Sequence, residues 1–93
     1  IKGNLEQNLD NPVKEVYNAS LKALDKLKID VYKKTLETHQ GVIYGYTEGQ
    51  DKTRVKITIQ SLTEKASNIK IRMGWVGDES RSIEILEAIK KAL

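Results

Sequence analysis

The sequence predicts an α+β fold, a two-layer sandwich in which two helices cover one face of an antiparallel sheet, in the order β-α-β-β-β-β-α. Three observations predict it. Apolar residues recur every three or four positions over residues 12–26 and 79–93, which is the helical period. Elsewhere they alternate with polar residues, as in strands that bury one face. Short loops join the last four strands, and two helices with one apolar face each must cover the same side of the sheet.

The composition fits one α+β domain over residues 1–93 and excludes several classes of protein. The chain carries 16 Lys and Arg against 13 Asp and Glu, a net charge of +3, with one His and no Cys. Without Cys there are no disulfides, thiol nucleophiles or thiolate metal sites, and one His makes other metal sites hard to assemble. No run approaches the roughly 20 apolar residues of a membrane span. We therefore expect a non-enzymatic protein without catalytic residues, cofactor or metal.

The first elements are a polar edge strand and a helix. Residues 1–9 alternate, and their apolar face holds Ile1, Leu5 and Leu9. Asn11 is expected to cap the helix that follows, with Pro12 at the first helical position. That helix runs over residues 12–26. Its inward stripe consists of Val13, Val16, Tyr17, Ser20, Leu21, Leu24 and Leu27.

The next two strands are rich in β-branched and aromatic residues. Residues 28–36 form one strand, His39-Gln40-Gly41 a turn, and residues 42–47 the next strand. Tyr44 and Tyr46 are two residues apart and therefore share a sheet face. They suit an aromatic platform for a ligand, but we expect them to fill the core with their hydroxyls at its rim.

The last two strands alternate most clearly. After a hairpin loop at residues 48–52, inward positions fall at Val55, Ile57 and Ile59. A second loop spans residues 61–67, and the following strand sends inward Ile69, Ile71, Met73 and Trp75. Gly77 and Asp78 end the sheet, and Asp78 caps the last helix. That helix is expected to bury Ile85, Leu86, Ile89 and Leu93.

Positive charge is concentrated in the last hairpin. Residues 52–72 hold six basic residues and one acid, and outward strand positions hold Arg54, Lys56, Lys70 and Arg72. These four residues, called the basic face below, are the candidate site for an acidic protein or an anionic membrane surface. The alternative is a solvated face that discourages edge-to-edge association. Nucleic acid is less favoured, because single-strand binders interleave aromatic with basic residues, whereas the outward neighbours here are Thr58, Gln60 and Gly74.

Five segments of the chain carry a resemblance to a known family. They are Lys2-Gly3-Asn4-Leu5, Val16-Tyr17-x-Ala19-x-x-x-Ala23-Leu24, Gly41-Val42-Ile43, Val55-Lys56-Ile57 and Ile71-Arg72-Met73-Gly74-x-x-Gly77-Asp78-Glu79-x-x-Ser82. Together they resemble a family of small bacterial lipoprotein domains of uncharacterised function. In that family an export signal and a lipid-modified Cys precede the domain. The resemblance therefore implies a periplasmic domain, held at the outer membrane through a lipid on a residue upstream of Ile1.

Two functional hypotheses follow. The chain begins at Ile1 without an initiating Met, so we expect it to be the mature part of a longer product. The first hypothesis is a non-enzymatic binding module of an exported, lipid-anchored bacterial protein. The alternative is a cytoplasmic module that binds a polyanion or nucleic acid through the basic hairpin at residues 52–72. The resemblance assigns no reaction and no catalytic residue to the chain.

Overall fold

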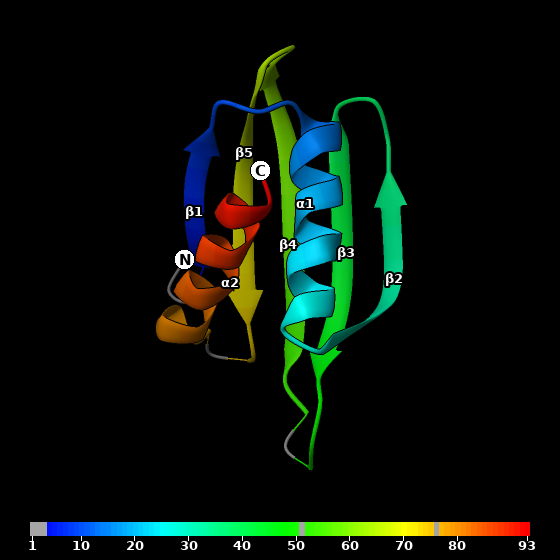
Figure 1. Cartoon of the computed structure of the whole chain (residues 1–93), viewed down its shortest axis with the longest axis vertical. Coiled ribbons are helices and arrows are strands. Elements are labelled where there is room, and N and C mark those ends of the chain that lie inside the picture. The colour runs from blue at the N-terminus through cyan, green and yellow to red at the C-terminus, as the bar shows by residue number, and fades with distance from the viewer. Residues whose placement is uncertain (1–3, 51, 76) are drawn as a thin grey trace.

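The first and last strands of the chain lie side by side in the sheet (Figure 1). This computed structural model describes residues 4–50, 52–75 and 77–93. Its elements are β1 (Asn4–Leu9), α1 (Val13–Lys26), β2 (Ile29–Leu36), β3 (Gln40–Thr47), β4 (Arg54–Thr63), β5 (Ala66–Met73) and α2 (Glu79–Ala92). The strand order is β1-β5-β4-β3-β2, with all neighbours antiparallel. The predicted fold class and element order are confirmed, while the part predicted for Ile1 in the first strand lies outside the described residues.

Both helices lie on one side of the sheet, and the core fills the space between the two layers (Figure 1). α1 packs over β2, β3 and β4, whereas α2 packs over β5 and β1 and also contacts α1. Apart from Trp75, the inward residues predicted for β4 and β5 are all buried: Val55, Ile57, Ile59, Ile69, Ile71 and Met73 lie in one core with Leu24, Leu86 and Ile89 of the helices. Leu21, which was expected to cover them as well, is half-buried and packs against this core. Neither helix of the described chain has the length and apolar character needed to cross a membrane.

The start of α1 differs from the prediction by one residue. Pro12 has an extended backbone (ψ 160°) and is itself the N-cap, and its carbonyl accepts the N–H of Val16 at 3.1 Å. Asn11 lies one position too early to cap the helix. Its amide instead donates to the Glu15 carboxylate at 3.3 Å. At α2 the predicted cap is confirmed, since the Asp78 carboxylate accepts the N–H of Arg81 at 3.0 Å.

The strands extend further into the predicted turns than their polar residues indicate. β3 already begins at Gln40, whose carbonyl accepts the N–H of Glu37 at 2.7 Å, so the turn at residues 39–41 was placed too late. Likewise, β4 and β5 continue through most of the loop predicted at residues 61–67. Only Glu64 and Lys65 separate the two strands. Polar residues at the end of a two-stranded hairpin are exposed on both sides, so their composition resembles that of a loop.

The expectation that Tyr44 and Tyr46 fill the core was wrong. Ile43 is fully buried on the inner face, so alternation along β3 turns both tyrosines outward, where they are half-buried. The inner positions beside Ile43 are glycines, Gly41 and Gly45, because neighbouring atoms approach closely: side chains of α1 and β2 at Gly41, and the β2 strand at Gly45. A Cβ on Gly41 would lie 2.9 Å from Cδ1 of Tyr17.

Two further residues expected in the core are exposed. Trp75 is 92% exposed because β5 ends at Met73 and Gly74, with a φ of +78°, turns the chain out of the sheet. Leu93 is 43% exposed because it follows the last helical residue of α2, and Ala92 packs against the core instead. Trp75 therefore belongs to the outer surface, next to the basic face.

Candidate functional site

The basic face lies on the side of the sheet that faces away from the helices. Arg54 and Lys56 project from β4, and Lys70 and Arg72 from β5; all are exposed except Arg72, which is half-buried. Lys56 is directly opposite Arg72, whereas Lys70 lies between Thr58 of β4 and Glu6 of β1. The structure thus brings the four predicted residues together on two adjacent strands. One like-charged pair is directly opposed.

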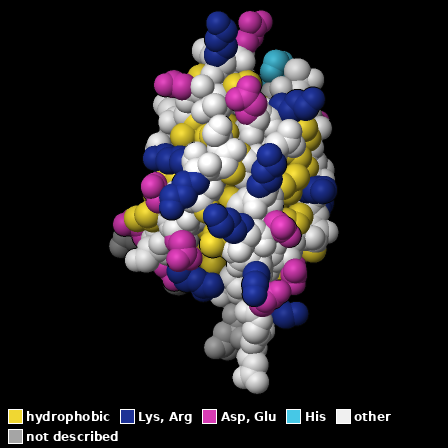
Figure 2. Space-filling model, in the orientation of Figure 1, with side chains coloured by type: hydrophobic (Ala, Val, Ile, Leu, Met, Phe, Trp, Pro, Cys, Tyr) yellow, Lys and Arg dark blue, Asp and Glu magenta, His cyan; other side chains and the backbone are white. Residues whose placement is uncertain are grey.

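Acidic residues on this outer face lie at its edges. Among the described strand residues, Glu6 projects outward from edge strand β1, and Asp30 from edge strand β2. A fifth outward cation, Lys33 of β2, lies opposite Tyr44. On the helical side, shown in Figure 2, Lys and Arg are interspersed with Asp and Glu. On the outer sheet face the four residues of the basic face therefore lie on the inner strands β4 and β5, whereas both acids lie on the edge strands.

Three tyrosines share the outer face with these cations. The rings of Tyr32 and Tyr46 stack with centroids 5.0 Å apart, and Tyr32 lies 6.0 Å from Tyr44 at a tilt. Lys33 and Lys56 hold their ammonium groups over the Tyr44 ring, at 5.7 and 5.5 Å from its centroid. Such contacts stabilise the cation modestly at exposed sites.

Aromatic residues do, then, interleave with basic ones, contrary to the sequence prediction. Tyr44 is opposite Lys56, and Tyr46 is opposite Arg54. The prediction considered outward neighbours on β4 and β5 only and placed the tyrosines in the core. The alternation of buried Ile43 with Tyr44 is the signal that would have placed them correctly.

The two arginines of the basic face have partners that hold them in position. Arg54 is hydrogen-bonded to the Tyr46 side chain, and this bond, with the nearby Tyr32, raises the pKa of Arg54 above its ordinary value. The Arg72 guanidinium donates to the side-chain oxygen of Asn4 at 3.3 Å and to the backbone carbonyl of Trp75. Arg72 therefore ties β1 and the turn after β5 together while remaining part of the positive surface.

An open groove of about 920 Å³ lies where the outer face meets the turn after β5. Its charged and aromatic lining consists of Lys52, Arg54, Lys56, Arg72, Tyr44 and Trp75. None of the described residues that line it is acidic. Three residues of the basic face meet in this groove, while Lys70 lies outside it. We call it the Trp75 groove.

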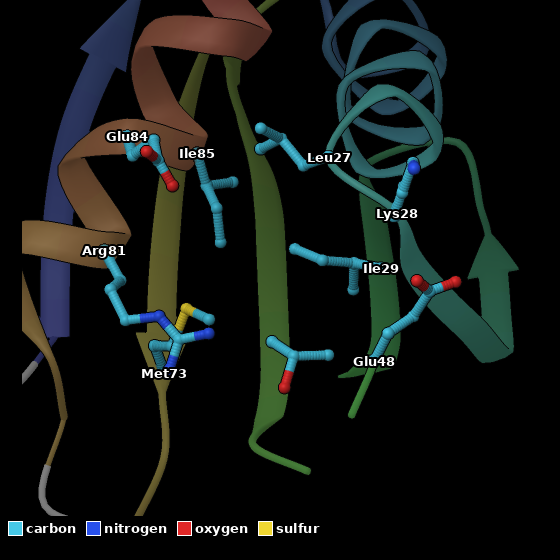
Figure 3. Close-up of a pocket in the computed structure, with 9 residues that line it drawn as sticks. Leu27, Lys28, Ile29, Glu48, Met73, Arg81, Glu84 and Ile85 are labelled. Atoms are coloured by element: carbon cyan, nitrogen blue, oxygen red, sulfur yellow. The ribbon is translucent and has the colours of Figure 1, made fainter. Parts of the chain in front are cut away.

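A smaller cavity of about 310 Å³ opens on the helical side, between the end of α1 and the start of α2 (Figure 3). Its apolar lining consists of Leu27, Ile29, Met73 and Ile85, and its charged lining of Lys28, Glu48, Arg81 and Glu84. The apolar residues are core side chains or pack against the core. Because two cations and two anions share its rim, this cavity selects neither sign of charge. The Trp75 groove is the stronger candidate site.

Comparison with known proteins places the chain in a family. No curated protein matches the sequence. Residues 1–92 match the family described as "Protein of unknown function (DUF3568)". Within the described residues, no three His, Asp or Glu side chains gather to hold a metal ion. Since the match extends over nearly the entire chain, the protein belongs to the DUF3568 family.

Proposed function

We propose that this domain is a non-enzymatic binding module that docks on an anionic membrane surface through the outer face of its sheet. The observation that carries the proposal is the segregation of charge: the basic face occupies the middle of an open sheet surface, and the acids Glu6 and Asp30 lie at its edges. Each Lys or Arg near an anionic lipid surface contributes about 1 kcal/mol of attraction. Four such residues on one surface therefore suffice for weak, salt-dependent docking.

The tyrosines support docking on lipid in particular. Tyr32 is 51% exposed, and Tyr44 and Tyr46 are half-buried beside it. Tyrosine has an apolar ring and a polar hydroxyl, so it is favoured at the level of lipid headgroups, where one end of a side chain is apolar and the other wet. A surface of cations alone would lack this apolar component.

We further propose that the domain is exported and anchored by a lipid on a residue upstream of Ile1. The resemblance to bacterial lipoprotein domains supports this proposal. A lipid anchor would raise the local concentration of the basic face at the membrane surface. Labelling the full-length precursor with radioactive palmitate should mark a Cys upstream of Ile1, and a precursor that takes up no label would refute the anchor.

The membrane proposal is tested with Lys56→Glu. Lys56 is exposed and faces Arg72, so a Glu there replaces a like-charged pair with an opposite-charged one. We expect the variant to fold, to be slightly more stable at low salt, and to bind anionic vesicles roughly tenfold more weakly. The measurement is co-sedimentation with phosphatidylglycerol-containing vesicles and with pure phosphatidylcholine vesicles, at low and moderate salt.

The matched control is Lys22→Glu, which makes the same charge change at an exposed position of α1 on the helical side. It should bind anionic vesicles as the unmodified protein does. Binding that is absent, or equal for both variants and both kinds of vesicle, would leave the basic face as a solvated surface.

Single-stranded nucleic acid is a second candidate partner, in a cytoplasmic setting. The observation that favours it is the pairing of Tyr44 with Lys56 and of Tyr46 with Arg54 across β3 and β4. It ranks second because the Tyr44 ring is already covered by two ammonium groups and Tyr46 is stacked on Tyr32. Binding to an oligothymidylate that weakens as salt rises, without binding to vesicles, would replace the membrane proposal.

A further inference from the structure

We infer that the Trp75 groove is a binding site for a phosphorylated ring compound, whose ring lies against the Trp75 indole and whose phosphate lies among Lys52, Arg54 and Lys56. This inference rests on the proposed function, because it names a ligand for one end of the same surface. Three observations support it. The groove is lined by cations, the Trp75 indole is exposed on a backbone held by hydrogen bonds, and the neighbouring tyrosine rings already contact other side chains.

Among the described residues that line the groove, every charged side chain is positive. Lys52, Arg54, Lys56 and Arg72 line it, and none of the described lining residues is acidic. Guanidinium and ammonium groups form strong charge-assisted hydrogen bonds with phosphate oxygens. The volume of about 920 Å³ is within the range of small-molecule sites, roughly 300–1,000 Å³. A compact ligand with one or two phosphates would meet several cations at once.

Trp75 is exposed, but the backbone that carries it is held in place. The N–H of Gly74 donates to the carbonyl of Arg54 at 2.8 Å, and the Arg72 guanidinium donates to the carbonyl of Trp75. Gly74 has a φ of +78°, a conformation that favours glycine. The turn therefore fixes the backbone position of Trp75 and leaves its indole exposed at the groove. A fixed backbone loses less conformational freedom when a ligand packs on the side chain that it carries.

Trp75 is the aromatic residue of the groove with a ring face open for stacking, so we expect a ligand with a single ring. The Tyr44 ring lies beneath Lys33 and Lys56, so it is not an open stacking surface. Trp75, with 92% of its surface exposed, supplies the open aromatic face in the groove. The negative face of an aromatic ring attracts both the edges of heterocycles and the polarised C–H groups of a sugar. In a ligand with one such ring and an attached phosphate, the ring would pack on the indole and the phosphate would contact the cations.

The test is calorimetric titration with glucose 6-phosphate, thymidine monophosphate and inorganic phosphate. We expect at least one ring phosphate to bind roughly tenfold more tightly than inorganic phosphate, because stacking on an aromatic side chain adds to the charge term. The Trp75→Ala variant should bind that ring phosphate no more tightly than it binds inorganic phosphate. Its affinity for inorganic phosphate should equal that of the unmodified protein. Which ring phosphate binds shows whether the ring is a sugar or a heterocycle.

Ile83→Ala is the matched control, since Ile83 is an exposed apolar residue of α2 outside the groove lining. It should bind all three probes as the unmodified protein does. The inference is overturned if no ring phosphate binds more tightly than inorganic phosphate, or if Trp75→Ala leaves the difference intact.

Lys70→Glu separates this inference from the membrane proposal. Lys70 belongs to the basic face but does not line the groove. The variant should weaken co-sedimentation with anionic vesicles and leave ring-phosphate binding unchanged. Loss of ring-phosphate binding in Lys70→Glu would count against the groove as the site, whereas a lack of vesicle binding by the unmodified protein would refute the membrane proposal alone.

Discussion

Replacing Ile57 with alanine is expected to lower the free energy of unfolding by about 2–5 kcal/mol. Ile57 is fully buried on the central strand β4, between Ile43 of β3 and Ile71 of β5. Its truncation removes apolar contacts and leaves a cavity that the surrounding strands cannot close. Domains of this size are stable by only about 5–15 kcal/mol, so the loss is a large fraction of the total. Urea unfolding followed by circular dichroism measures it.

Thr58→Ala is the control for Ile57→Ala, because Thr58 is the next residue along β4 and projects from the outer face. We expect its effect to stay within about 1 kcal/mol. A loss below about 0.5 kcal/mol for Ile57→Ala would mean that the inner and outer faces of the sheet are reversed, since a shift of one residue exchanges them.

Gly45→Val is expected to destabilise the domain by about 3 kcal/mol or more, at the upper end of the cost of overpacking. A Cβ on Gly45 would lie 2.8 Å from the backbone oxygen of Asp30 and 3.0 Å from Cγ2 of Ile29. The obstacle is backbone in the paired strand β2, so it cannot move aside as a flexible side chain can. Relief requires β2 to separate from β3 near Val31, the pairing partner of Gly45.

Hydrogen exchange gives the most direct measurement of Gly45→Val, because amides of β2 and β3 should lose protection before those of β4 and β5. Val42→Ile is the control, since it adds bulk to a half-buried outer position of the same strand. Its stability should stay within about 0.5 kcal/mol of the unmodified protein. Unchanged protection of β2 in Gly45→Val would show that the strand accommodates a side chain there.

The sequence predicted the central part of the sheet because the period of two is strict where one face is buried. Along β4 and β5, buried Ile and Val alternate with outward-facing Lys, Arg and Thr, so both the core and the basic face could be assigned. Trp75 continues this alternation in the sequence, but Gly74 takes the chain out of the sheet. Periodicity describes the order of side chains and does not show where pairing ends.

The Trp75 groove could not be predicted, because its lining comes from three separate parts of the chain. Tyr44 lies on β3, Lys56 on β4 and Trp75 beyond β5, and only the cross-strand register brings them together. Tyrosine suits both a core and a half-exposed sheet face, so Tyr44 and Tyr46 could be placed either way from residue type alone. The register shift between Val31 and Lys33, which sets Lys33 opposite Tyr44, likewise has no signal in the composition of β2.

The position of Trp75 also determines what optical spectroscopy can observe in this protein. It is the one Trp of the chain, and its indole is in water in the folded state as it is in the unfolded state. Its emission maximum should therefore hardly move on denaturation, and a flat fluorescence trace would say nothing about stability. The same indole lines the groove, so a ligand that covers it would shift the emission of a protein that remains folded. In this molecule, tryptophan fluorescence is a probe of binding and not of folding.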